Sequence, residues 1–199
     1  LMVMVMVVLD VAQVLLSPAD VRRLRQGKPV MPTLESNVAG ARRMVMVQDI
    51  PAPNAVVMNR IMDLEQYGAM VDNVQQVANY ETSTHKAVRT IKSTYDVSVV
   101  GMKFKYFMEH HYDPAQNCMV FNLDYSKRSD IDDSVGYWYV QPSNGRTSRV
   151  YYSCECKLRG WVPGPVYSVL TKEAMTKATT WVSRESIKEW KMQQQSDGL

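Results

Sequence analysis

The sequence predicts an α+β fold in which an antiparallel β-sheet is covered by one long C-terminal helix. Residues 74–158 form successive runs rich in valine, isoleucine, threonine and tyrosine, several of them alternating between apolar and polar residues. Residues 166–191 contain no glycine or proline, and their apolar residues recur with a helical period. The chain of 199 residues is 46% hydrophobic with a net charge of +3, which excludes disorder over most of its length.

The first 40 residues are predicted to be an extension of the domain. Residues 1–16 are mostly apolar, but the uninterrupted run 1–9 is too short to span a bilayer. Because the sequence starts with Leu1, we expect that an upstream targeting segment has been removed. The apolar segment is interpreted as a remnant of that segment or as an element docked on a partner or membrane surface. The alternative is that it packs on its own domain.

A short basic helix is predicted to follow. Ser17 and Pro18 are typical of a helix start, and Gly27 ends the helix. The proline, glycine and asparagine content of residues 28–40 predicts a linker. The sequence is thus divided into the 1–40 extension, a domain at 41–191 and a flexible tail at 192–199.

The extension also contains the densest basic cluster of the chain, formed by Arg22, Arg23, Arg25 and Lys28. It is interpreted as contacting an anionic lipid or nucleic-acid surface, or simply as the solvated face of a helix. No basic stripe is interleaved with aromatic residues, so nucleic-acid binding is not expected. Three cysteines are too few for a secreted disulfide framework and favour a reducing compartment.

The domain is predicted to contain one strand, two short helices, a long meander and the C-terminal helix. The predicted strands are 42–48, 74–83, 87–100, 102–112, 119–125, 135–141 and 149–158, and the short helices are 55–62 and 63–71. Loops are predicted at 113–117 and 126–133, and a tight turn at 143–145. The sheet must bury one face, and only the long helix is large and apolar enough to cover it.

A cavity between the helix and the sheet is expected. Ala174 and Ala178 lie on the apolar stripe of the helix with Leu170, and their small side chains would leave space opposite the sheet. Close packing of helix on sheet is the alternative. Alternation places further side chains on the inner face of the strands, so the candidate cavity residues are Tyr106, Met108, His110, Phe121, Trp138, Tyr152, Leu170, Ala174 and Ala178.

Residues 41–190 resemble the START-like (SRPBCC) superfamily, especially polyketide cyclase/dehydrase and coenzyme Q-binding (Coq10-like) proteins. The resemblance rests on Ala52-Pro53, Asp63 and Tyr67, Gly136-Tyr137-Trp138-Tyr139-Val140 with Pro142 and Thr147, and Val162-Pro163-Gly164. It implies a helix-grip fold, a curved sheet around the long helix with two short helices after the first strand. A hydrophobic cavity for sterols, phospholipids, quinones, polyketides or plant hormones is implied too. Residues 118–190 also resemble uncharacterised algal members, which favours a plastid over a mitochondrion.

The sequence contains few residues arranged for catalysis or metal binding. Cys154 and Cys156 share one strand face without a second ligand pair, and adjacent His110 and His111 point to opposite faces, so no metal or cofactor is predicted. His110 is the best candidate for a general acid or base. Its alternative role is a histidine bonded to a neighbour, while Tyr106 and Tyr152 are candidates for ligand contacts or ordinary core residues.

The sequence therefore predicts a non-enzymatic protein that binds or carries a lipophilic small molecule, such as a quinone, an isoprenoid pigment or a lipid. Residues 1–28 are expected to contact a membrane surface or a membrane complex. Two alternatives remain open. The fold could serve as an accessory subunit of a photosynthetic or respiratory membrane complex, or it could be a polyketide cyclase-like enzyme using His110 or a cavity tyrosine.

Overall fold

The computed structural model describes residues 11, 14–35, 42–99, 101–142, 145–159 and 164–197. For 33–35, 42–44, 99, 142, 164–175 and 197 it describes the backbone alone. The elements in chain order are α2 (Pro18–Arg25), β1 (Thr33–Glu35), β2 (Arg42–Ile50), α3 (Asn54–Met62), η1 (Leu64–Gln66), α4 (Tyr67–Met70), β3 (Val74–His85), β4 (Val88–Val99), β5 (Met102–Asp113), β6 (Cys118–Leu123), β7 (Ile131–Pro142), β8 (Ser148–Leu158) and α5 (Gly164–Asp197).

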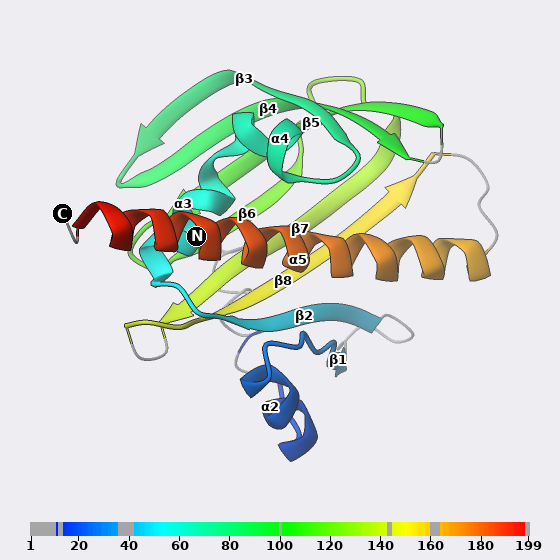
Figure 1. Cartoon of the computed structure of the whole chain (residues 1–199). Helices are drawn as coiled ribbons and strands as arrows, with labels where there is room; N and C mark the ends of the chain where they lie inside the picture. The colour runs from blue at the N-terminus through cyan, green and yellow to red at the C-terminus, as the bar shows by residue number, and fades with distance from the viewer. Residues whose placement is uncertain are drawn as a thin grey trace.

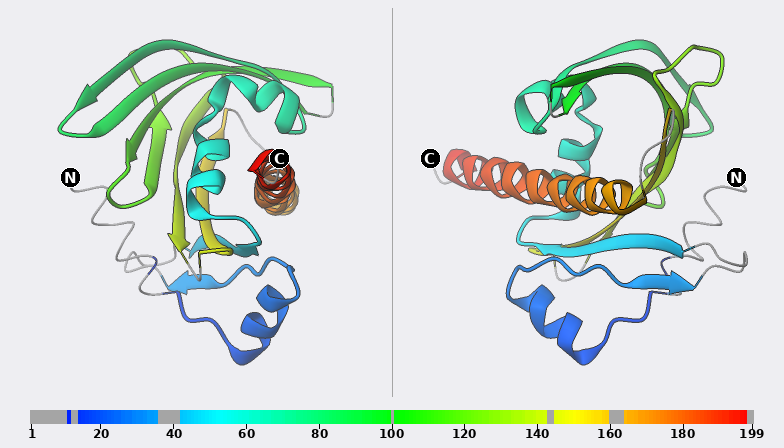
Figure 2. Two further views of the ribbon diagram at one scale, coloured as in Figure 1. Left: turned by 60° about the vertical axis from the view of Figure 1, so that its left-hand side comes forward. Right: turned by 90° about the vertical axis from the view of Figure 1, so that its right-hand side faces the viewer.

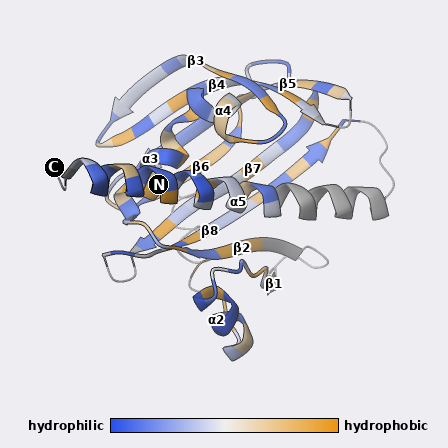
Figure 3. Ribbon diagram, viewed as in Figure 1, coloured by the Kyte–Doolittle hydropathy of each residue, from blue (hydrophilic) through white to orange (hydrophobic). Residues whose placement is uncertain are grey.

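All strand pairs are antiparallel, and the sheet order is β1-β2-β8-β7-β6-β5-β4-β3. The sheet curves strongly around α5, as Figures 1 and 2 show. Along the strands, hydrophobic and hydrophilic residues alternate (Figure 3), so each strand presents one set of side chains to α5 and the other set to the opposite side. This confirms the predicted helix-grip fold, with its two short helical pieces after the first strand of the domain.

Helix α5 packs against α3, β2 and β8. Its apolar stripe includes Trp181 and Val182, both buried in the main core. Two polar contacts fix the neighbouring helices on it. The Arg184 guanidinium donates to the Met70 carbonyl at the end of α4 over 2.5 Å, and Arg60 of α3 lies 3.9 Å from the Glu189 carboxylate. None of the described helices is long and apolar enough to cross a membrane.

Several predicted boundaries were wrong. Residues 28–40 were predicted to be a linker, but they contain β1, and Val30 bridges to Val47 of β2. Strand β6 ends at Leu123, so Tyr125 lies outside it and is 69% exposed, while β7 already begins at Ile131. Helix α5 continues past the predicted end at 191 to Asp197.

The described part of the N-terminal extension packs on the outer face of the sheet, beyond β2 from α5 (Figure 1). Ser17 caps α2, as the sequence predicted, and forms a capping box with Asp20. Leu24 and Val30 join an outer cluster whose sheet members are Val45, Val47, Cys118, Val120, Tyr137 and Tyr151. Val11, Val14 and Leu16 pack against the same cluster. For these residues the structure agrees with packing on the chain's own domain.

Ser186 gives a test of the packing under α5. Its side chain is fully buried and its hydroxyl has no hydrogen-bond partner among the described residues. A buried hydroxyl without a partner costs free energy, so Ser186→Ala is expected to raise the free energy of unfolding by about 1 kcal/mol. Urea denaturation measures this change.

The matched control is Ser148→Ala. The Ser148 hydroxyl is equally buried but donates to the Ala52 carbonyl over 2.7 Å. Its loss is expected to lower stability by about 1 kcal/mol, because the carbonyl loses its donor. Equal losses for both variants would contradict the assignment of Ser186 as unsatisfied.

Candidate functional site

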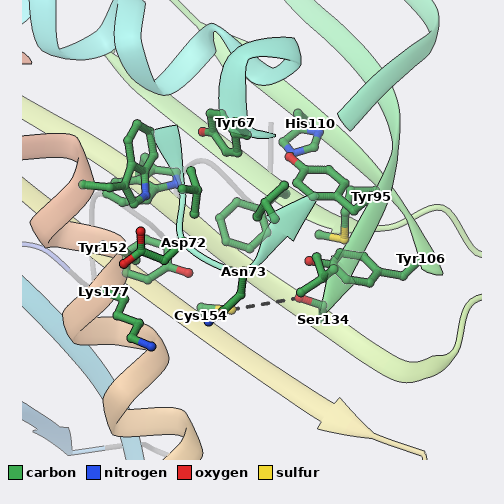
Figure 4. A pocket seen from close by; sticks show the side chains of 18 of the residues that line it. Tyr67, Asp72, Asn73, Tyr95, Tyr106, His110, Ser134, Tyr152, Cys154 and Lys177 are labelled. Atoms are coloured by element: carbon green, nitrogen blue, oxygen red, sulfur yellow. Dashed lines mark hydrogen bonds between the residues drawn. The ribbon is translucent and has the colours of Figure 1, made fainter. Parts of the chain in front are cut away.

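A cavity of about 260 Å³ lies between the inner face of the sheet, the turn from α4 to β3, and α5 (Figure 4). Seven of the nine side chains predicted to line such a cavity do so: Tyr106, Met108, His110, Phe121, Trp138, Tyr152 and Ala178. The other two, Leu170 and Ala174, belong to α5, but their side chains lie outside the part that the structure describes. That any of these residues contacts a ligand stays a prediction.

Seven aromatic side chains line the cavity. Trp138 and Tyr152 on neighbouring strands β7 and β8 stack with ring centroids 4.1 Å apart. Across the cavity, Tyr95 and Tyr106 stack at 5.2 Å with nearly parallel planes. Trp181 of α5 closes one side against Tyr67 of α4, at 4.9 Å. Flat, apolar surfaces of this kind favour an apolar ligand and give it defined ring positions.

Gly136 makes room for the Phe121 ring in this wall. The two residues are paired across β6 and β7. A Cβ atom at Gly136 would lie 2.5 Å from the Phe121 ring and would also overlap the Ser153 carbonyl oxygen. The glycine therefore allows the aromatic ring to lie flat across the β7 backbone. Sequence analysis placed Gly136 in a family motif but gave no reason for it.

Both ring nitrogens of His110 have hydrogen-bond partners inside the protein. Its Nδ1 lies 3.3 Å from the Ile91 carbonyl oxygen, and its Nε2 lies 3.0 Å from the Tyr95 hydroxyl. A carbonyl only accepts, so Nδ1 carries the hydrogen, and Nε2 accepts from the tyrosine. Burial lowers the pKa of His110 to about 4. The imidazole is thus neutral at pH 7 and its accepting nitrogen is already occupied, which disfavours a role as a general base.

This arrangement predicts how stability depends on pH. The unfolded chain binds a proton at this histidine near pH 6.5, whereas the folded protein binds it only near pH 4. Between these values the unfolded state holds more protons, so acid favours unfolding. We expect the His110 contribution to be complete above pH 6.5. It should fall by about 1.4 kcal/mol per pH unit as the pH drops toward 4.

Urea denaturation across this pH range tests the prediction with two variants. His110→Asn should remove this part of the slope. His111→Asn should keep it, because His111 lies half-exposed on the other face, where its Nδ1 is 3.0 Å from the Thr90 hydroxyl. Identical pH profiles for wild type and His110→Asn would disprove the assignment.

The other polar groups in the cavity are hydroxyls and a thiol. Among the described residues, the Tyr106 hydroxyl has no hydrogen-bond partner, so it is free to meet a ligand. Cys154 lies 4.0 Å from the Ser134 hydroxyl, and burial raises the pKa of its thiol above the ordinary value. The thiol therefore stays protonated at neutral pH and is a poor nucleophile. Burial also raises the pKa of Tyr106 and Tyr152.

The mouth of the cavity carries the charged residues. Asp72 and Asn73, both exposed, lie in the turn before β3, and Lys177 of α5 lines the cavity as well. Asn73 has a φ of 71°, which asparagine tolerates better than most residues. Sequence analysis missed these mouth residues, since nothing in their local pattern connects them with a helix a hundred positions away. The described residues contain no group of three or more side chains able to hold a metal ion.

Solved structures with the same fold include a lipid transfer protein and an aromatase/cyclase. Human STARD10 aligns with a TM-score of 0.65 at 13% identity, covering 90% of this chain and 84% of that chain. A STAR-related lipid transfer protein from Xanthomonas axonopodis gives 0.63 at 11% identity, covering 79% and 93%. The Zhui aromatase/cyclase from Streptomyces sp. R1128 gives 0.58 at 13% identity, covering 75% and 93%.

These similarities establish the fold. The chain has the START-like, helix-grip fold, with a cavity lined partly by aromatic rings under its long helix. No model of a protein family matches the sequence, and no curated protein sequence matches it either. The expected resemblance to algal members therefore has no support from the comparisons.

Proposed function

We propose that the protein binds a lipophilic small molecule in the cavity and carries it without chemical change. The observation that supports this most directly is the cavity wall, which is aromatic and apolar while its one histidine is bonded internally. Binding would come from burial of apolar surface, with the Tyr106 hydroxyl fixing the ligand's orientation. The similarity to the STAR-related lipid transfer protein from Xanthomonas axonopodis is consistent with this role.

The size of the cavity restricts the ligand. At about 260 Å³ it is slightly smaller than the roughly 300–1,000 Å³ typical of small-molecule sites. A compact ring system fits such a volume better than a lipid with two acyl chains. Among the predicted ligands, the head ring of a quinone or of an isoprenoid pigment suits the stacked aromatic walls best.

Native mass spectrometry of the protein purified from its own source, followed by organic extraction, tests the proposal. We expect a stoichiometric lipophilic molecule. An empty protein that co-purifies in fixed ratio with a membrane complex would overturn the proposal and favour the accessory-subunit alternative. The location in a plastid stays a prediction, and the same purification identifies the compartment.

A pair of variants on α5 tests whether the ligand binds in the cavity. Ala178→Phe fills the space where Ala178 lines the wall, and we expect it to reduce binding of the extracted ligand at least tenfold. Thr180→Phe adds the same ring on the exposed side of the helix and should bind normally. Equal binding by both variants would place the ligand elsewhere.

One observation favours a cyclase as the second candidate. The unpartnered Tyr106 hydroxyl could donate a hydrogen bond to a carbonyl of a bound polyketide, a placement that an enzyme would need. Conversion of a supplied polyketide by wild type, lost in Tyr106→Phe, would establish this alternative over the carrier. Unchanged recovery of every extracted ligand supports the carrier.

A further inference from the structure

We propose that the outer side of α2, together with Leu15, is a docking surface for an anionic lipid bilayer. This surface is formed by Leu15, Arg22, Arg23, Arg25 and Lys28, all of them exposed. Helix α2 lies on the opposite side of the sheet from α5 (Figure 2), and none of these five residues lines the cavity. The proposal does not depend on what occupies the cavity.

The orientation of α2 determines where its arginines point. Leu24 is the buried residue of the helix and anchors it in the outer cluster. With 3.6 residues per turn, Arg22 lies about 160° around the helix from Leu24, and Arg23 and Arg25 lie about 100° to either side. The three guanidinium groups therefore cover the half of the helix that faces away from the sheet. Figure 3 shows α2 as mostly hydrophilic.

These cations have few polar contacts within the described part of the protein. Arg23 reaches the Pro29 carbonyl at 3.4 Å, and its charge is one of the causes that lower the pKa of Asp20. The Asp20 carboxylate is bonded to Ser17, accepting hydrogen bonds from the Ser17 hydroxyl over 2.6 Å and the Ser17 amide over 3.0 Å. Among the described residues, no ion pair to Arg22, Arg25 or Lys28 is present. A net positive surface is therefore presented to solvent.

Leu15 favours a bilayer over other anionic partners. It is 87% exposed, more than any other large hydrophobic side chain among the described residues. Its neighbours Val14 and Leu16 pack on the outer cluster, so Leu15 points away from the sheet, as Arg22 does. In sequence, residues 1–9 just upstream carry no charge. Exposed apolar side chains beside arginines are typical of surfaces that lie in a lipid headgroup region, and a nucleic acid would not use them.

Co-sedimentation of the full chain with lipid vesicles tests the proposal. We expect binding to vesicles containing phosphatidylserine that weakens as salt rises, and little binding to pure phosphatidylcholine. The triple variant R22Q/R23Q/R25Q should lose roughly fivefold in affinity per arginine, or roughly a hundredfold in total. Leu15→Ser should weaken binding even at high salt, where the electrostatic attraction is screened.

The matched control is K86Q/R89Q/K103Q. These three cations are also exposed and form no ion pair with another described residue, but they lie on the β3–β4 hairpin and β5, away from α2. The control should bind vesicles like the wild type. Equal losses in the two triple variants would mean that net charge alone causes binding, which overturns the proposal. No binding of the wild type, or binding to RNA that is insensitive to Leu15→Ser, overturns it as well.

Discussion

Replacing Gly136 with alanine is expected to lower the free energy of unfolding by roughly 3 kcal/mol, near the upper end of the cost of overpacking a core. The added methyl group would meet the Phe121 ring and the Ser153 carbonyl at the same time. Neither neighbour can move freely, because the ring belongs to the cavity wall and the carbonyl belongs to β8. Urea denaturation, with thermal melting as a second probe, measures the loss.

A second substitution separates crowding from backbone effects. In the variant Gly136→Ala/Phe121→Ala, the ring that the new methyl group meets is absent. The double variant should therefore lose less stability than the sum of the losses of the two single variants. Gly145→Ala is the backbone control, since that glycine has a φ of 77° and open space around it. It is expected to cost about 1 kcal/mol. A stable Gly136→Ala protein would disprove the tight fit.

Replacing Trp181 with alanine is expected to cost roughly 3–5 kcal/mol, the range found when a large aromatic core residue is truncated. Trp181 is 3% exposed and is a ring through which α5 contacts both α4 and the sheet. Its centroid lies 4.9 Å from that of Tyr67 and 6.2 Å from that of Trp138. Its loss would enlarge the cavity and loosen α4 together. Denaturation midpoints of wild type and variant measure the difference.

Trp190 provides the control on the same helix. It is only partly buried where it packs against the main core. Trp190→Ala should therefore cost clearly less than Trp181→Ala, since less area returns to water and a smaller space is left. A larger loss at Trp190 would contradict the assignment of Trp181 as the anchor of α5.

The fold was predictable from the sequence because its elements differ in period. Alternation over residues 102–112 and a helical repeat after 166 define a sheet and its covering helix without reference to long-range contacts. Strand β1 was missed because its three residues carry no periodic signal. The end of the alternating run at Tyr125 was misplaced because β6 stops where its pairing with β5 stops, at Leu123 opposite Met108, which depends on the neighbouring strand.

The cavity wall was predictable only one strand at a time. Alternation correctly placed Tyr106, Met108 and His110 on one face, but it contains no information about which residues of other strands lie beside them. The contact between His110 and the Ile91 carbonyl follows from the register of β4 on β5, in which these two residues lie opposite each other. Tyr67 joins the wall because α4 folds back over the sheet, a tertiary effect that local sequence does not encode.

The stacking that forms the cavity wall also makes its occupancy visible in ultraviolet light. Two of the protein's four tryptophans, Trp138 and Trp181, line the cavity with ring centroids 6.2 Å apart. A molecule bound against these indole rings changes the surroundings on which their emission depends. An aliphatic ligand would shift the tryptophan emission to shorter wavelengths, whereas a quinone would accept the excitation and quench the fluorescence. The protein therefore carries a fluorophore pair that can distinguish classes of ligand in a single titration, without a label.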